Sequence, residues 1–174
     1  GRHNGREETT TLCLIPAGRE ATTLPLIAAG GIGTGEAIFA LMALGAEGVQ
    51  MGTRFALTDE SSASDIFKEY CLRLNEGDTK LLLKKLAPTR LVTNSFRDRL
   101  EAAEGRGASA EELRELLGRG RAKKGIFEGD LEEGELEIGQ VAALFRRRQS
   151  VDEVMKELLE GYRRASDKIR SAGL

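Results

Sequence analysis

One stretch near the N-terminus constrains the fold more than any other part of the chain. Leu24–Ala29 is a continuous apolar run, as expected for a strand buried on both faces, and Pro25 suits the first residues of a strand. Glycines then interrupt the run, Thr34 is placed to cap a helix, and Gly45 is placed to end it. Glu47–Gly52 is predicted to form the next strand. A strand, a helix and a strand joined by such short loops predict a βαβ unit, and hence an α/β fold with a parallel sheet.

Helices joined by charged loops are expected beyond this unit. The next helix is predicted to begin near Ser61 or Ser62. Its apolar face would carry Ile66, Phe67, Tyr70, Cys71 and Leu74. The short apolar runs Leu81–Leu83 and Leu91-Val92 fit either a strand or a helix. Gly118–Gly139 is rich in glycine and charge, and it is predicted to be a mobile or surface connection.

Two capping boxes mark the starts of later helices. Ser109 with Glu112 and Ser150 with Glu153 have the spacing in which each side chain can bond the other residue's backbone N–H. The helix after Ser150 carries apolar residues at helical spacing, so one of its faces needs a partner. We expect this helix to pack back onto the rest of the chain, with a homodimer contact as the alternative.

Composition excludes several classes of protein. A net charge of −2 argues against nucleic acid as the partner, and no apolar run approaches the roughly 18 residues of a membrane span. The basic clusters Arg119–Lys124 and Arg146–Arg148 are balanced by acidic residues in Asp130–Glu137, which predicts solvated surface. Two cysteines and one histidine favour a reducing, cytoplasmic setting and no metal site. Cys13 and Cys71 are expected to be small core residues.

The ends of the two predicted strands form the first candidate site. Parallel strands end at one edge of a sheet, so both glycine-containing turns are expected to meet there. Glycine allows the backbone to approach an anion closely, and a helix N-terminus adds a favourable dipole. The sequence therefore predicts a phosphate site, with simple tight turns as the alternative. The candidate residues are Gly30, Gly31, Gln50, Met51, Gly52 and Thr53.

A dinucleotide site is excluded at the same turn. Gly31 and Gly33 match the first two glycines of the G-x-G-x-x-G fingerprint, but Glu36 occupies the third position. A side chain there would crowd the helix against the strand, and its charge would repel a pyrophosphate.

The single histidine is the second candidate. His3 lies in the segment Gly1-Arg2-His3-Asn4-Gly5, where flanking glycines would let a ligand approach the backbone. It is the only side chain here whose ordinary pKa lies near neutrality, which suits a general acid or base. An ordinary surface or structural histidine is the alternative.

Five segments of the chain form a recognisable pattern together: His3-Asn4-Gly5, Thr9-Thr10-Thr11, Leu26–Ile32, Leu44-Gly45-Ala46 and Gly48–Phe55. They resemble the nitronate monooxygenase family, which includes the flavin-dependent enoyl-acyl-carrier-protein reductase II. The resemblance is specific from residue 1 to about residue 60 and looser from there to the last helix. Arg2 departs from the family pattern, in which a second glycine usually precedes the histidine.

The resemblance implies an FMN-binding TIM (β/α)₈ barrel with a small helical region near the C-terminus. A chain of 174 residues is too short for a whole barrel, which needs at least about 200. The chain is therefore expected to be the C-terminal portion of such an enzyme. Residues 1–80 would carry the last βα units and the FMN phosphate site, 81–149 a small helical, charged region, and 150–174 the helix that packs back. By resemblance, Gly30, Gly31 and Gln50–Thr53 hold the FMN phosphate.

The family also implies the chemistry. An alkyl nitronate would be oxidised with O₂ to a carbonyl compound and nitrite, with His3 as the acid/base group beside the α-carbon. The alternative is an FMN- and NAD(P)H-dependent enoyl-acyl-carrier-protein reductase, in which the same histidine protonates the α-carbon of an enoyl thioester. An alternative of another class is an inactive remnant that binds FMN or phosphate, or an interaction module.

Overall fold

The βαβ unit expected from the sequence is present in the computed structural model, which describes residues 9–173. Strand β1 (Ile27–Ala29) and strand β2 (Gly48–Gln50) pair in parallel, and helix α2 (Gly35–Ala43) connects them. The Thr34 hydroxyl oxygen accepts a hydrogen bond from the Ala37 backbone N–H at 3.2 Å, so this threonine is the expected cap. Gly45 follows the helix with a φ of +105°, which only glycine adopts readily.

The parallel sheet is not a closed barrel in this chain. Within residues 9–173 it has two strands, so β1 has no second neighbour there. The expectation that Leu24–Ala29 is buried on both faces is therefore wrong: Ala28 is buried, but Ile27 is 56% exposed. In a closed barrel the remaining strands and helices would cover such a residue.

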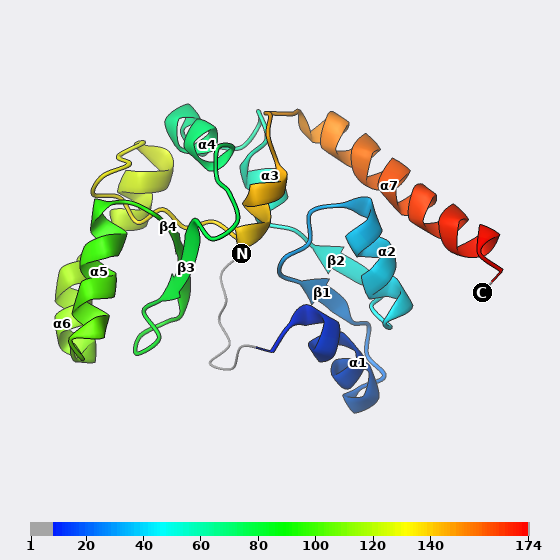
Figure 1. Ribbon diagram of the computed structural model, residues 1–174, viewed down its shortest axis with the longest axis horizontal. Coiled ribbons are helices and arrows are strands. Elements are labelled where there is room, and N and C mark those ends of the chain that lie inside the picture. The colour runs from blue at the N-terminus through cyan, green and yellow to red at the C-terminus, as the bar shows by residue number, and fades with distance from the viewer. Residues whose placement is uncertain (1–8, 174) are drawn as a thin grey trace.

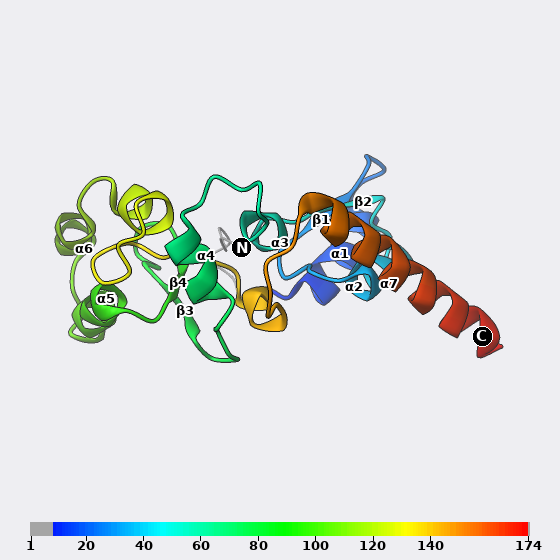
Figure 2. The same cartoon turned by 90° about the horizontal axis from the view of Figure 1, so that it is seen from above.

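Helices cover the parallel sheet and enclose an apolar core with it, and together these elements form the first lobe of the molecule. Helix α1 (Thr11–Ala21) packs on β1, although Pro16 lies inside it and leaves one backbone acceptor unpaired. Helix α7 (Val151–Ser171) lies along α2, as expected for the helix that packs back, and its C-terminal half extends beyond α2 (Figures 1 and 2). The core of this lobe contains Ile15, Ala28, Ile32, Leu41 and Ala46.

A second lobe lies on the opposite side of two short helices, α3 (Thr53–Ala56) and the 3₁₀ helix η2 (Gln140–Leu144), as Figure 1 shows. Its elements are α4 (Asp65–Cys71), β3 (Thr79–Leu82), β4 (Thr89–Val92), α5 (Ser95–Gly105), α6 (Ala110–Leu117) and the π-helix η1 (Lys123–Phe127). Both predicted capping boxes are formed, at the starts of α6 and α7. We call residues 65–138 the small lobe.

The structure of the small lobe differs from the sequence expectations in three places. Strands β3 and β4 form an antiparallel hairpin from the two apolar runs that the sequence left ambiguous. Helix α4 begins at Asp65 with Ser64 as its cap, a few residues later than expected. The segment 118–139 is not a surface connection throughout, because Gly125, Leu136 and Ile138 are buried and the Val92 backbone N–H donates to the Leu136 carbonyl at 3.0 Å. The domain boundaries at residues 80 and 149 stay predictions.

The two cysteines have different environments. Cys71 is fully buried in α4, and this burial raises the pKa of its thiol to about 12, which suits a small core residue. The same expectation is wrong for Cys13, which is exposed on α1. Across residues 9–173, no helix combines the length and apolar character needed to cross a bilayer.

Candidate functional site

The two glycine-containing turns meet at one edge of the parallel sheet. Ala29 lies opposite Gln50 in the β1–β2 register, so the residues after each strand leave the sheet side by side. Gly30 and Gly31 follow β1, while Met51 and Gly52 follow β2 and lead into α3. This arrangement is the one that the strand order predicted.

The backbone of these turns is open to a ligand. Gly30 and Gly31 have φ angles of +96° and +71°, a region that residues with side chains rarely adopt. A Cβ atom added to Gly31 or Gly52 would meet no atom within 4 Å. Among the described residues, the backbone N–H groups of Gly31 and Gly52 have no hydrogen-bond acceptor. The turns thus combine uncrowded backbone with N–H donors that have no acceptor among the described residues, and an anion needs both.

The side chains of the predicted site residues differ in their roles. Gln50 is exposed and extends from the end of β2, while Met51 packs against the apolar core under the sheet. Thr53 is 6% exposed, and its Oγ1 accepts a hydrogen bond from the Gly139 backbone N–H at 3.0 Å. The Thr53 hydroxyl is thus bonded to a distant segment of the chain. The backbone of Thr53 forms the start of α3. His3 lies outside the described residues.

Two residues beside the turns, Thr11 and Arg54, were not assigned to the site by the sequence analysis. The Thr11 hydroxyl, in the first turn of α1, donates to the Gly30 carbonyl at 3.1 Å and so fixes the first turn. Arg54 is 5% exposed, directly after the second turn. The sequence signal for Thr11 was a run of three threonines, and for Arg54 a basic residue that directly follows a Gly-Thr pair.

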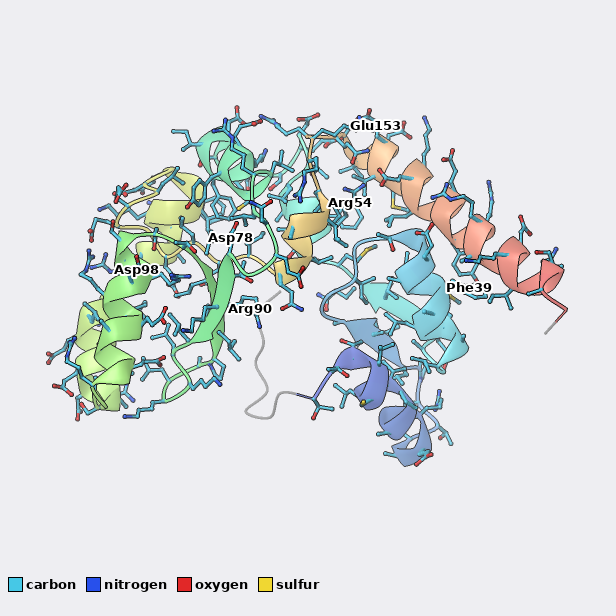
Figure 3. All side chains as sticks on the ribbon, viewed as in Figure 1. Phe39, Arg54, Asp78, Arg90, Asp98 and Glu153 are labelled. Atoms are coloured by element: carbon cyan, nitrogen blue, oxygen red, sulfur yellow. The ribbon has the colours of Figure 1, made fainter. Side chains whose placement is uncertain are left out.

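Arg54 makes hydrogen bonds to two residues that lie 95 and 103 positions further along the chain. Its Nη2 donates to Gln149 Oε1 at 2.9 Å and to Glu157 Oε2 at 2.8 Å, and its guanidinium lies 4.4 Å from the centre of the Phe145 ring. Figure 3 shows Arg54 beside η2, near the start of α7. The Gln149 amide also donates to Glu157, and this bond, assisted by the charge of Arg54, holds the pKa of the Glu157 carboxyl below its ordinary value.

Comparisons with known proteins agree with these features. A family model described as nitronate monooxygenase matches residues 1–161. A probable nitronate monooxygenase from Staphylococcus aureus is 39% identical over 98 residues, which cover 55% of this chain and 27% of the relative.

Solved structures with the same fold match over most of this chain. FabK from Thermotoga maritima is 32% identical with a TM-score of 0.88, over 95% of this chain and 53% of its own. A nitroalkane oxidase from Streptomyces ansochromogenes is 26% identical with a TM-score of 0.76, over 97% of this chain and 50% of its own. The chain thus spans about half the length of these two proteins. With its residues matched from 1 to 161, the chain belongs to the nitronate monooxygenase family.

Proposed function

We propose that this chain is the FMN-phosphate-binding portion of an FMN-dependent oxidoreductase of nitronate monooxygenase type, which oxidises alkyl nitronates with O₂ to a carbonyl compound and nitrite. The observation that supports this most is the pair of open glycine turns at one sheet edge, in a chain of this family. A phosphate monoester carries negative charge and several acceptor oxygens, and the turns offer N–H donors with no side chain in the way.

The residues at the turns fit a phosphate group. Gly30 and Gly31 would bind it from β1, and Gly52 with the backbone of Thr53 would bind it from the start of α3. Gly52 has an open face, and Gln50 extends an exposed amide from the neighbouring strand end. When bound at this edge, FMN would supply the redox chemistry that amino-acid side chains lack.

His3 is our candidate for the acid/base group. In a neutral nitroalkane or an enoyl thioester, a proton must leave or reach the α-carbon, and an imidazole with an ordinary pKa near neutrality can hold that proton. A preformed nitronate has already lost it, so the need for His3 depends on the substrate. Arg2, which stands where the family usually has glycine, would place a cation next to the imidazole.

The family resemblance leaves a second function open. An FMN- and NAD(P)H-dependent enoyl-acyl-carrier-protein reductase would use the same phosphate turns and the same histidine. The residues of this chain that we assign to the site therefore serve both reactions.

Rapid mixing without oxygen separates the candidates. The full-length protein, purified and loaded with FMN, is mixed with an alkyl nitronate or with NADH, and the loss of the flavin absorption band is followed. Fast bleaching by the nitronate and slow bleaching by NADH supports the proposed function. The reverse order supports the enoyl reductase. A protein that binds FMN but is bleached by neither is the non-enzymatic FMN- or phosphate-binding module, and this result overturns both enzyme proposals.

A further inference from the structure

We propose that Arg54 is a positioning residue for the phosphate turns, which it fastens to the C-terminal segment 139–157. This inference rests on the proposed function, because it concerns how the same turns keep their shape. Arg54 would not touch the phosphate. It would hold the turn before it in the geometry that makes FMN bind more tightly than a flavin without phosphate.

The first argument is the direction of the Arg54 side chain. Its guanidinium is buried, and it contacts Gln149, Glu157 and the face of the Phe145 ring. All three belong to the segment between η2 and the second turn of α7. A cation that bound the phosphate would direct its donors toward it. The Nη2 group of Arg54 instead donates to Gln149 and Glu157, and Nε is buried with no hydrogen-bond partner among the described residues.

The second argument is that the neighbouring residue, Thr53, is also hydrogen-bonded to the segment 139–157. The Thr53 Oγ1 accepts from the Gly139 N–H at 3.0 Å, and this hydrogen bond is buried. Two consecutive residues at the start of α3 are thus fastened to the same distant segment, one at each side of η2. Because α3 has only four residues, its internal hydrogen bonds cannot hold its first turn alone.

The third argument is that the Phe145 ring contacts one residue just after each turn, Gly33 and Arg54. A Cβ atom on Gly33, which follows the first turn, would lie 2.6 Å from the tip of this ring, so the ring packs directly on the Gly33 backbone. The Arg54 guanidinium also contacts this ring, with its central carbon 4.4 Å from the ring centre. One ring therefore sets the separation of the segments that carry the two turns, and Arg54 keeps that ring in place.

The test compares FMN with riboflavin, which has the same ring system but no phosphate. The ratio of the riboflavin and FMN dissociation constants reports the phosphate turns alone, while general loosening of the fold changes both constants together. The variants are Arg54→Lys, which keeps the charge and loses the flat guanidinium, and Glu157→Gln, which keeps the acceptor oxygen and loses the charge. We expect Arg54→Lys to lower the ratio about tenfold, equivalent to about 1.4 kcal/mol, and Glu157→Gln to lower it by less.

Arg148→Gln is the matched control. Arg148 belongs to the same segment and makes two ion pairs at 2.9 Å, but these reach Asp59 and Asp65, beyond α3. Its loss should leave the ratio unchanged even if the melting temperature falls.

Each outcome decides between the two proposals. A wild-type protein that binds FMN no better than riboflavin overturns the phosphate site, and this inference with it. A wild-type preference for FMN that Arg54→Lys leaves intact overturns this inference alone, as does an equal loss of affinity for both flavins. If Arg54→Lys fails to fold, Glu157→Gln decides the matter by the same ratio.

Discussion

The contact between α2 and α7 should be disrupted by a single methyl group at Gly35. A Cβ atom built there would lie 2.1 Å from the Leu158 carbonyl oxygen and 2.2 Å from the Tyr162 backbone nitrogen. Both distances are more than 1 Å short of an ordinary contact, and both atoms are backbone, so α7 as a whole would have to move. Overpacking of this kind costs up to about 3 kcal/mol. The better helix propensity of alanine returns less than about 1 kcal/mol, because Gly35 is the first residue of α2 and not an interior one.

We therefore expect Gly35→Ala to lower the free energy of unfolding by about 2 kcal/mol, and the melting temperature by about 4–8 °C. Urea denaturation followed by circular dichroism measures this effect. Gly105→Ala is the matched control, since Gly105 also lies in a helix, but a Cβ there meets nothing within 4 Å. That variant should be unchanged or more stable by up to about 1 kcal/mol. A Gly35→Ala protein with a denaturation midpoint at or above that of the wild type would refute the close approach of the two helices.

Four further outcomes are expected. Gly52→Asp should abolish FMN binding without unfolding the protein, because the backbone at Gly52 (φ −91°, ψ −63°) admits a side chain while a carboxylate would repel the phosphate; flavin titration and circular dichroism check both parts. In the full-length enzyme, His3→Ala should lower turnover of a neutral nitroalkane or enoyl substrate by about 10²–10⁴-fold with little loss of flavin. Unchanged turnover on those substrates would falsify the role of His3. The purified 174-residue chain should self-associate, because Leu24 and Ile27 are 70% and 56% exposed beside a strand that pairs only with β2 in the described residues. Sedimentation velocity that finds a single monomeric species would contradict this. The stability that Glu157 contributes should be complete above the pKa of this carboxyl in the unfolded chain and should be lost as the pH falls through its lower folded-state pKa, since its hydrogen bond from Gln149 lowers that pKa. The melting temperature of Glu157→Gln should therefore depend less on pH below pH 4.5 than that of the wild type.

Much of the candidate site could be predicted because its signals are local. The turns after β1 and β2 depend on a short apolar run followed by glycine, and the parallel pairing follows from the length of the connection between the runs. The resemblance to a known family added the nature of the ligand. What the spacing could not reveal is that the Thr53 hydroxyl would accept a hydrogen bond from Gly139, because that partner lies 86 residues further along the chain.

Local signals failed where two conformations were equally compatible with the residues. Leu81–Leu83 and Leu91-Val92 are too short for periodicity to separate strand from helix, and their pairing across the hairpin decided it. Helix α1 contains Pro16, which cannot donate a backbone hydrogen bond, and the packing of Ile15 on the sheet offsets this loss.

The sequence by itself determined the elements whose start and end are specified within a few residues. Thr34, the two capping boxes and the glycine after α2 each satisfy backbone groups of their own turn, so no distant partner is needed to specify them. Only the tertiary structure decided that Cys13 is exposed while Cys71 is buried, and that Arg54 is tied to Gln149 and Glu157. Burial and ion pairing depend on which residues the folded chain brings together, and partners 95 and 103 positions apart leave no periodic trace in the sequence.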